Sequence, residues 1–215
     1  VHSVGGITAL ACCILIGPSH TGSWMPWSLL MGGAYRTPLG DVPIDARCAE
    51  ALRARCDFLE PDAWSQRGEH AIEVLLPFLQ QLGPAGMTIV PIISSAADDA
   101  QQSRLAQALA QVIRMQEEPV LLIASADFSH YVSQPDGAWR DQRILDVVKR
   151  LEGRAVVEQA RADATIMCGD GAIAMVLEAA NHLGAARAEV VAYQSSADAG
   201  ADPDSATGYA GVLIR

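Results

Sequence analysis

Short, continuously apolar runs alternate with longer amphipathic stretches along this chain. Three runs, at 12–16, 87–93 and 120–124, have the length and composition of strands that are buried on both faces of a sheet. Two further strands are predicted near the C-terminus, at 189–193 and 209–214.

Between these strands, apolar residues recur at the three- and four-residue spacing of helices with one buried face. Asp98 is a suitable N-cap for the second of these helices, and Pro77 should kink the first. The pattern predicts helices at 69–82, 98–115, 139–151 and 171–183.

The alternation of strands and helices predicts an α/β fold, with a mostly parallel central sheet covered by helices on both faces. The chain has 215 residues, which suits one domain with a substantial core, and it contains no internal repeat or low-complexity linker. We therefore expect a single domain over residues 1–215.

Composition narrows the classes of function. Hydrophobic residues make up 50% of the chain and charged residues 19%, which is typical of a globular protein. The formal net charge of -10, without runs of like charge, argues against nucleic acid and against a membrane surface as partners. The five cysteines are odd in number and include no CxxC pair, so we expect reduced thiols in a cytoplasmic protein without a signal peptide.

Residues with catalytic or metal-binding chemistry follow three of the predicted strands. His20 follows the first strand, Asp127 and His130 follow the third, and Tyr193 ends the penultimate one. Because ligands bind where the carboxyl ends of parallel strands meet, these side chains should share one rim of the sheet. The alternative for His20 is a purely structural role, in which it forms a hydrogen bond to a nearby backbone group after the Gly-Pro turn.

Cys168 directly precedes the last predicted helix, where a thiol is a good metal ligand or nucleophile, although a lone cysteine is commonly just buried. Imidazoles with one thiolate suit iron, copper or zinc and do not suit magnesium or calcium.

His70 fits either the rim of the site or a surface pair with Glu73. Trp24 fits either a pocket wall or a cover over the core.

Six short motifs occur in order along the chain: Gly17–His20, Tyr35–Gly40, Glu69–Glu73, Ser125–His130, Cys168–Gly169 and Gln194–Ser196. Together they resemble the Memo family, whose bacterial and archaeal members are called AmmeMemoRadiSam system protein B. This resemblance covers nearly the whole chain. It implies a fold similar to that of class III extradiol ring-cleaving dioxygenases, which hold non-haem iron(II) with two histidines and a carboxylate.

The resemblance also implies roles for individual residues. His20 and Cys168 match metal ligands, and the cysteine stands where the dioxygenases have their carboxylate. His130 matches a nearby histidine that does not bind the metal and acts as acid or base in the dioxygenases. Asp127 matches the aspartate of the same motif, which would orient His130 or bind the substrate.

The family's remaining ligand lies in a His-Ala-Gly-Tyr motif, for which His2 is the only candidate in this chain. Residues 3–11 are too few for the usual crossover connection before the strand at Cys12. We therefore expect residues to be missing between Ser3 and Val4, and we expect His2 to be the third ligand.

Two functions remain open on the sequence alone. The first is a redox enzyme of dioxygenase type that acts on a small organic substrate, with Fe(II) as the preferred metal and Cu or Zn as alternatives. Its pocket would be lined by His70, Tyr193, Ser195 and Trp24. The second is a metal-binding adaptor that binds a peptide without turnover. The name of the bacterial family members further implies AMMECR1-like and radical SAM proteins as partners.

Overall fold

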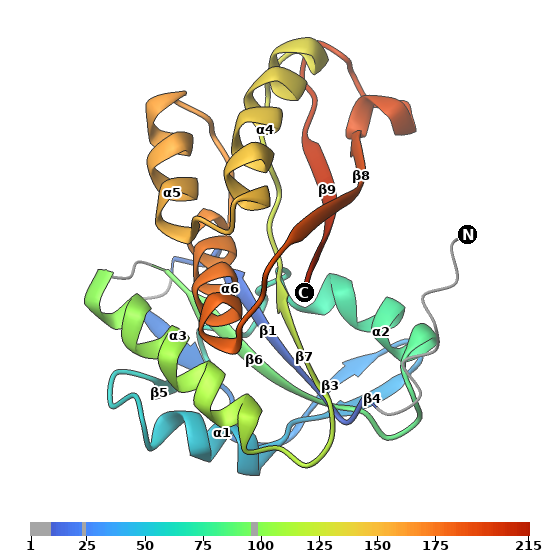
Figure 1. Cartoon of the computed structure of the whole chain (residues 1–215). Helices are drawn as coiled ribbons and strands as arrows, with labels where there is room; N and C mark the ends of the chain where they lie inside the picture. The colour runs from blue at the N-terminus through green and yellow to red at the C-terminus, as the bar shows by residue number, and fades with distance from the viewer. Residues whose placement is uncertain (1–9, 23–24, 96–98) are drawn as a thin grey trace. The chain divides into compact units, whose positions relative to one another are not determined.

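A computed structural model describes residues 10–22, 25–95 and 99–215. The chain falls into two compact units, Val1–Ser125 and Ala126–Arg215. Each unit has a hydrophobic core of its own, and Figure 1 shows the course of the chain through both. The single domain over residues 1–215 stays a prediction.

A five-stranded sheet forms the centre of the first unit. Strand β1 (Cys12–Pro18) lies between β6 (Thr88–Ser94) and β7 (Val120–Ala124), and all three run parallel. Beyond β6 follow the short strands β2 (Trp27–Leu29) and β5 (Glu60–Pro61). The pairing of β2 with β6 is antiparallel and the others are parallel, so the sheet is mostly parallel, as predicted.

Two short helices cover one face of this sheet. They are the 3-10 helix η1 (Glu73–Leu75) and the α-helix α2 (Leu76–Leu82). Leu76 and the preceding Ile72 are fully buried against a cluster that includes Cys13 of β1. Side chains alternate across a strand, so the neighbours of Cys13 in β1 point to the other face.

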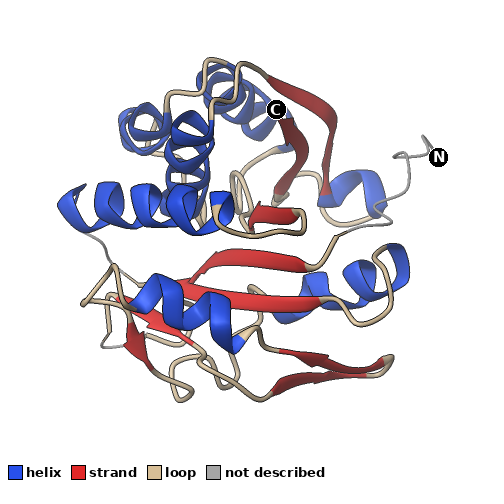
Figure 2. Cartoon of the chain, turned by 60° about the horizontal axis from the view of Figure 1, so that its bottom comes forward, coloured by secondary structure: helices blue, strands red, loops and turns tan. Residues whose placement is uncertain are grey.

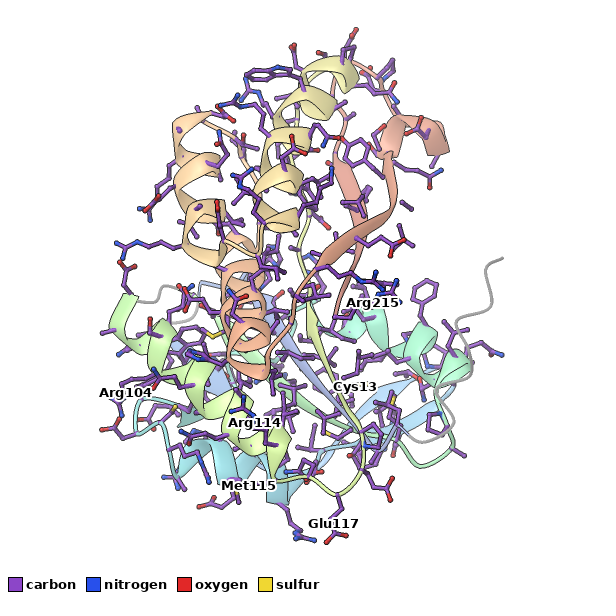
Figure 3. All side chains as sticks on the ribbon, viewed as in Figure 1. Cys13, Arg104, Arg114, Met115, Glu117 and Arg215 are labelled. Atoms are coloured by element: carbon purple, nitrogen blue, oxygen red, sulfur yellow. The ribbon has the colours of Figure 1, made fainter. Side chains whose placement is uncertain are left out.

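Helices α1 (Ala46–Arg53) and α3 (Asp99–Arg114) belong to that other face. The Cys48 side chain of α1 faces Cys12 of β1 and lowers the pKa of its thiol, and α1 packs against both β6 and α3. The polar side of α3 projects outward, as Arg104 shows in Figure 3. Because helices cover both faces of a mostly parallel sheet, the predicted α/β fold class is confirmed, and it is consistent with a class III extradiol dioxygenase-like fold.

Three α-helices and a β-hairpin build the second unit. Helices α4 (Gln134–Lys149), α5 (Gly153–Ala162) and α6 (Asp170–Leu183) bury apolar side chains together with β8 (Ala188–Ser195) and β9 (Gly208–Ile214). The two strands are antiparallel, and β9 leads to the C-terminus (Figure 2). Across both units, no helix in the described ranges has the length and apolarity needed to cross a bilayer.

The helix predicted over 69–82 is wrong in its first half. Only residues 76–82 are α-helical, and Pro77 stands in the first turn of α2 rather than at a kink. Proline has no backbone N–H, so it fits a first turn, where that N–H has no helical partner, and is costly farther inside a helix. Glu69 and His70 therefore lie in irregular backbone before the helices and are not on a helical surface.

The position of the penultimate strand also differs from the prediction. β8 pairs with β9 in a two-stranded sheet of its own, so its end does not belong to the parallel sheet. The pattern also does not predict α5, nor the hairpin of β3 (Ala34–Thr37) and β4 (Gly40–Pro43). Helix α4 begins at Gln134, before the predicted start at Trp139, because Ser133 caps it. Asp98, the predicted cap of α3, lies outside the described residues.

Candidate metal centre

His20 lies in the loop that follows β1. This loop begins against the end of β6, where the backbone N–H of Ser19 donates to the carbonyl of Ser94 at 2.9 Å. The imidazole of His20 is 32% exposed, and its Nδ1 lies 2.7 Å from Oε1 of Glu69. His20 therefore lies just beyond the carboxyl end of β1, as predicted.

Glu69 is the buried carboxylate that orients His20, and it is 1% exposed. Its oxygens accept hydrogen bonds from Nδ1 and the backbone N–H of His20, and from the backbone N–H of Ala71 at 3.0 Å. Burial alone would raise the pKa of Glu69, but these hydrogen bonds outweigh it and lower the pKa. An ionised carboxylate only accepts hydrogen bonds, so the neutral His20 ring is protonated at Nδ1 and has a lone pair on Nε2.

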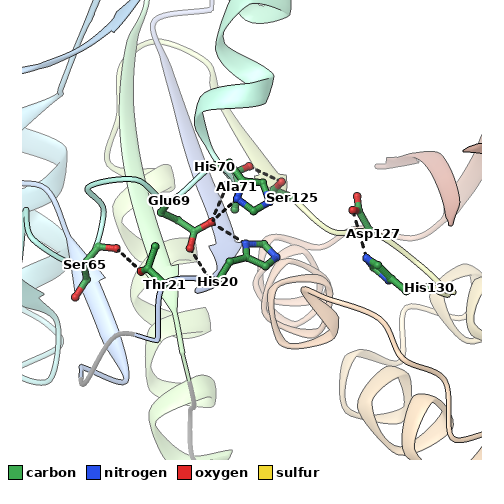
Figure 4. A network of polar contacts seen from close by, with 9 residues as sticks. All are labelled: His20, Thr21, Ser65, Glu69, His70, Ala71, Ser125, Asp127 and His130. Atoms are coloured by element: carbon green, nitrogen blue, oxygen red, sulfur yellow. Dashed lines mark hydrogen bonds and ion pairs between the residues drawn. The ribbon is translucent and has the colours of Figure 1, made fainter.

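His70 lies beside His20. The two rings are stacked, with 4.2 Å between their centroids and 25° between their planes. Nδ1 of His70 lies 3.6 Å from Oε1 of Glu69, so the carboxylate beside His70 is Glu69 and not Glu73, the alternative partner. His20, Glu69 and His70 each offer an atom that could bind a metal, within 4.8 Å of the others (Figure 4).

A second group of three side chains occurs in the second unit and contains Asp127, His130 and Cys168. Asp127 and Cys168 pair through their backbones, with both N–H···O distances at 3.2 Å. Gly169, which adopts the left-handed conformation with φ of 81°, is the N-cap of α6, so Cys168 stands directly before the helix start, as predicted. The possible ligand atoms of these three residues also lie within 4.8 Å of one another.

The tautomer of His130 follows from its surroundings. Its Nδ1 lies 2.8 Å from the carbonyl oxygen of Phe128 and 3.2 Å from that of Ile166. Carbonyl oxygens accept and cannot donate, so Nδ1 carries the proton and Nε2 has the lone pair of the neutral ring. Nε2 lies 3.6 Å from Oδ2 of Asp127, and Figure 4 marks this contact with a dashed line. His130 thus has one nitrogen anchored to the backbone and the other facing the carboxylate of Asp127.

Asp141 of α4 supports this segment and was not singled out by the sequence. Although fully buried, its carboxylate accepts hydrogen bonds from the backbone N–H of Ser129 at 3.0 Å, from the Ser129 hydroxyl at 2.9 Å and from the Tyr193 hydroxyl at 2.8 Å. A Cβ atom at Gly208 would collide with the carboxylate, so only glycine fits there. Periodicity gives no sign of this role, because an aspartate in an amphipathic helix usually faces water.

Two predicted pocket residues are engaged in structural hydrogen bonds. Tyr193 donates its hydroxyl to Asp141, and burial, followed by this carboxylate, raises the pKa of Tyr193. The Ser195 hydroxyl takes part in a capping box with Asp198 at the start of the 3-10 helix η2 (Ser196–Ala199). Their role in a substrate pocket stays a prediction.

The structure brings the other predicted site residues together in two groups. His20 is grouped with His70 in the first unit, and Cys168 with Asp127 and His130 in the second. The donor chemistry fits the metal that the resemblance implies, because an imidazole nitrogen and a partly exposed thiol are ligands of iron, copper and zinc. His2, the predicted third ligand, and Trp24, the predicted pocket residue, lie outside the described residues.

Comparison with known proteins agrees with the sequence motifs. The family model described as Memo-like protein matches residues 8–213. A MEMO1 family protein of Methanopyrus kandleri is 31% identical over 202 residues, which cover 94% of this chain and 71% of the relative. A relative from Methanococcus maripaludis is 33% identical over 98% of this chain and 74% of its own length. Another, from Aquifex aeolicus, is 31% identical over 94% of this chain and 74% of its own length. The chain therefore belongs to the Memo-like family.

Proposed function

We propose that this protein is a metal-dependent redox enzyme of dioxygenase type that acts on a small organic substrate and uses iron(II), and that His20 and Cys168 are metal ligands. The observation that carries the proposal is the contact between His20 and the buried Glu69. Metal-binding histidines almost always donate their second ring N–H to such a partner, which fixes the tautomer and orients the ring. Glu69 performs this task for His20 and so prepares Nε2 for a metal.

Cys168 supports the same proposal from its position. Its backbone is fixed to Asp127 by two hydrogen bonds, and its thiol is partly exposed next to the N-cap of α6. A thiol before a helix start is favoured as thiolate, which is the form that binds metals. Thiolate ligation also suits copper and zinc, so iron(II) is the preferred and not the exclusive choice.

The residues of the second group supply the acid–base part of the proposed reaction. A bound iron ion would supply redox chemistry and positions for oxygen and substrate. Nε2 of His130 would take a proton from a hydroxyl group of the substrate, and Asp127 would accept a hydrogen bond from the protonated ring. Such catalysis contributes roughly 10²–10⁴-fold in rate.

Anaerobic purification, metal analysis and oxygen-consumption assays with catechol-like and phenolic substrates test this proposal. We expect one equivalent of bound iron, lost in His20→Ala and Cys168→Ser. His130→Ala should keep the iron and lose activity, and His182→Ala, on the last turn of α6, serves as the matched control that changes neither. Loss of iron in His130→Ala would show that the assigned role of His130 is wrong.

The same assays separate the enzyme from a metal-binding adaptor. Full metal occupancy without oxygen consumption for any substrate of these classes would favour an adaptor that works with AMMECR1-like and radical SAM partners. The five cysteines all lie in the described ranges and none forms a disulfide, which favours the cytoplasmic location included in the proposal.

A further inference from the structure

Helix α2 and the 3-10 turn η1 before it carry apolar side chains on both their inner and their outer face. On the inner face, Leu76 is fully buried in the core cluster of the first unit. On the outer face, Val74, Phe78 and Leu82 are 51%, 69% and 75% exposed. Residues four positions apart lie on one side of a helix, so these three side chains form an apolar stripe. A helix that is apolar all round is normally buried, so the stripe indicates an interface.

The outer face of α2 also lacks charge. Residues 74–97 include no Asp, Glu, Lys, Arg or His, although the chain as a whole has a formal net charge of -10. Among the exposed residues of α2, only Gln81 is polar. Two copies of so acidic a chain repel each other over most of their surfaces, so close approach costs least where both are uncharged.

The face of the sheet that α2 covers is itself incompletely covered at its edge. Leu121 and Ile123 of the edge strand β7 pack against the core cluster beneath α2 but are only partly buried. They lie opposite Cys13 and Leu15 of the neighbouring strand β1, which are fully buried. The helix above this face is short, since the seven residues of α2 make about 10 Å of helix. Further apolar cover would therefore complete this layer.

We propose that this face binds a second copy of the chain, so that the outer stripe of α2 from each copy packs against the α2 side of the other. A two-fold interface uses the same patch on both copies and must be complementary to itself. This face meets that condition, because it combines a helix with surplus apolar surface and a sheet edge that needs cover. A cationic partner would instead be attracted to the acidic parts of the surface. The inference goes beyond the proposed function and does not depend on it.

Sedimentation velocity of the full chain over roughly 1–100 μM, where modest interfaces dissociate, tests the proposal. We expect a reversible equilibrium between monomer and dimer. Phe78→Glu and Leu82→Glu should each weaken association about 100-fold, because an unpaired charge would be buried at the interface. Trp64→Glu is the matched control, since Trp64 is an aromatic residue of the same unit, is 78% exposed and lies outside the stripe. Circular dichroism should show a native fold in all three variants, because the replaced side chains are exposed.

Hydrogen exchange at high and low protein concentration, read by mass spectrometry, locates the contact. Residues 73–82 should exchange more slowly in the dimer, whereas α3, on the opposite face of the sheet, should not change. A monomer at every concentration would overturn the proposal, as would a dimer that both glutamate variants leave intact. Slow exchange of residues 73–82 that does not depend on concentration would show that the stripe is covered within one chain, which also contradicts it.

Discussion

At the scale of single residues, the second group of site residues is held by a buried carboxylate and by a glycine that makes room for it. Asp141 binds the segment that ends in His130, and Gly208 leaves the space that Asp141 occupies. Neither residue is a metal ligand, yet both determine where His130 lies. Their replacement should therefore affect stability before it affects chemistry.

Gly208→Ala should strongly destabilise the protein, because the new Cβ would collide with Oδ2 of Asp141 and lie 3.0 Å from the Tyr193 hydroxyl. Overpacking of this kind costs about 1–3 kcal/mol, or more where the backbone cannot shift. Gly211→Ala in the same strand is the control, since its nearest contact would be Val191 at 3.8 Å. Urea unfolding measures the difference, and equal effects of the two changes would contradict the packing argument.

Asp141 should also give the protein a pH-dependent stability. Burial raises its pKa, and the hydrogen bonds from Tyr193 and Ser129 offset this only in part. A folded-state pKa above the unfolded value near 3.9 means that the folded state binds the proton more tightly. The Asp141 contribution to the free energy of unfolding therefore falls as pH rises from about 4 through the folded-state pKa.

Asp141→Asn removes this titration. The difference in free energy of unfolding between wild type and variant should change with pH above about 4 and level off at higher pH. Urea unfolding at a series of pH values measures this difference. A constant difference over the whole range would show that Asp141 does not titrate as described.

At the scale of elements, strands are predicted correctly where the apolar run is long, and they are missed where it is short or irregular. β1 and β6 follow from continuous apolar sequence, because they are buried on both faces. β7 follows from the same kind of apolar run, although its residues are only half-buried. β5 has two residues and β2 three, too few for any periodicity. The antiparallel hairpin of β8 and β9 is hidden because its long connection resembles the crossover of a parallel pair.

The residues of the candidate site also differ in how well the sequence predicts them. His20 and Cys168 are predictable because each stands at the end or start of a regular element. The role of Glu69 is not, since its contact with His20 joins residues 49 positions apart. Long-range contacts of this kind leave no periodic signal along the chain.

Ser195, which the sequence predicts to line the pocket, also caps a short helix. Ser195→Ala should lower the free energy of unfolding by about 1 kcal/mol, because it removes the capping hydroxyl at the start of η2. Ser205→Ala, at an exposed serine in the following loop, should have almost no effect. If both variants unfold at the wild-type urea concentration, the cap contributes nothing measurable.

At the scale of the whole molecule, the proposed metal should link binding to stability. A ligand at about 100 times its dissociation constant stabilises the folded state by roughly 2.7 kcal/mol, which corresponds to about 5–10 °C for a chain of this size. Anaerobic thermal scans with Fe(II) or Co(II) should show this shift in wild type and a smaller one in His20→Ala. An identical shift in both proteins would mean that the metal binds elsewhere.

The burial of the cysteines has a practical consequence. Cys12, Cys13, Cys48 and Cys56 are all buried, whereas Cys168 is partly exposed. Because thiol reagents need access to the sulfur, a native-state alkylation experiment read by mass spectrometry should add a single label, at Cys168. If the proposed metal binds Cys168, the labelling rate should fall when metal is added, and the mass shift then reports metal occupancy. A second label acquired equally fast would show that one of the buried thiols opens to solvent.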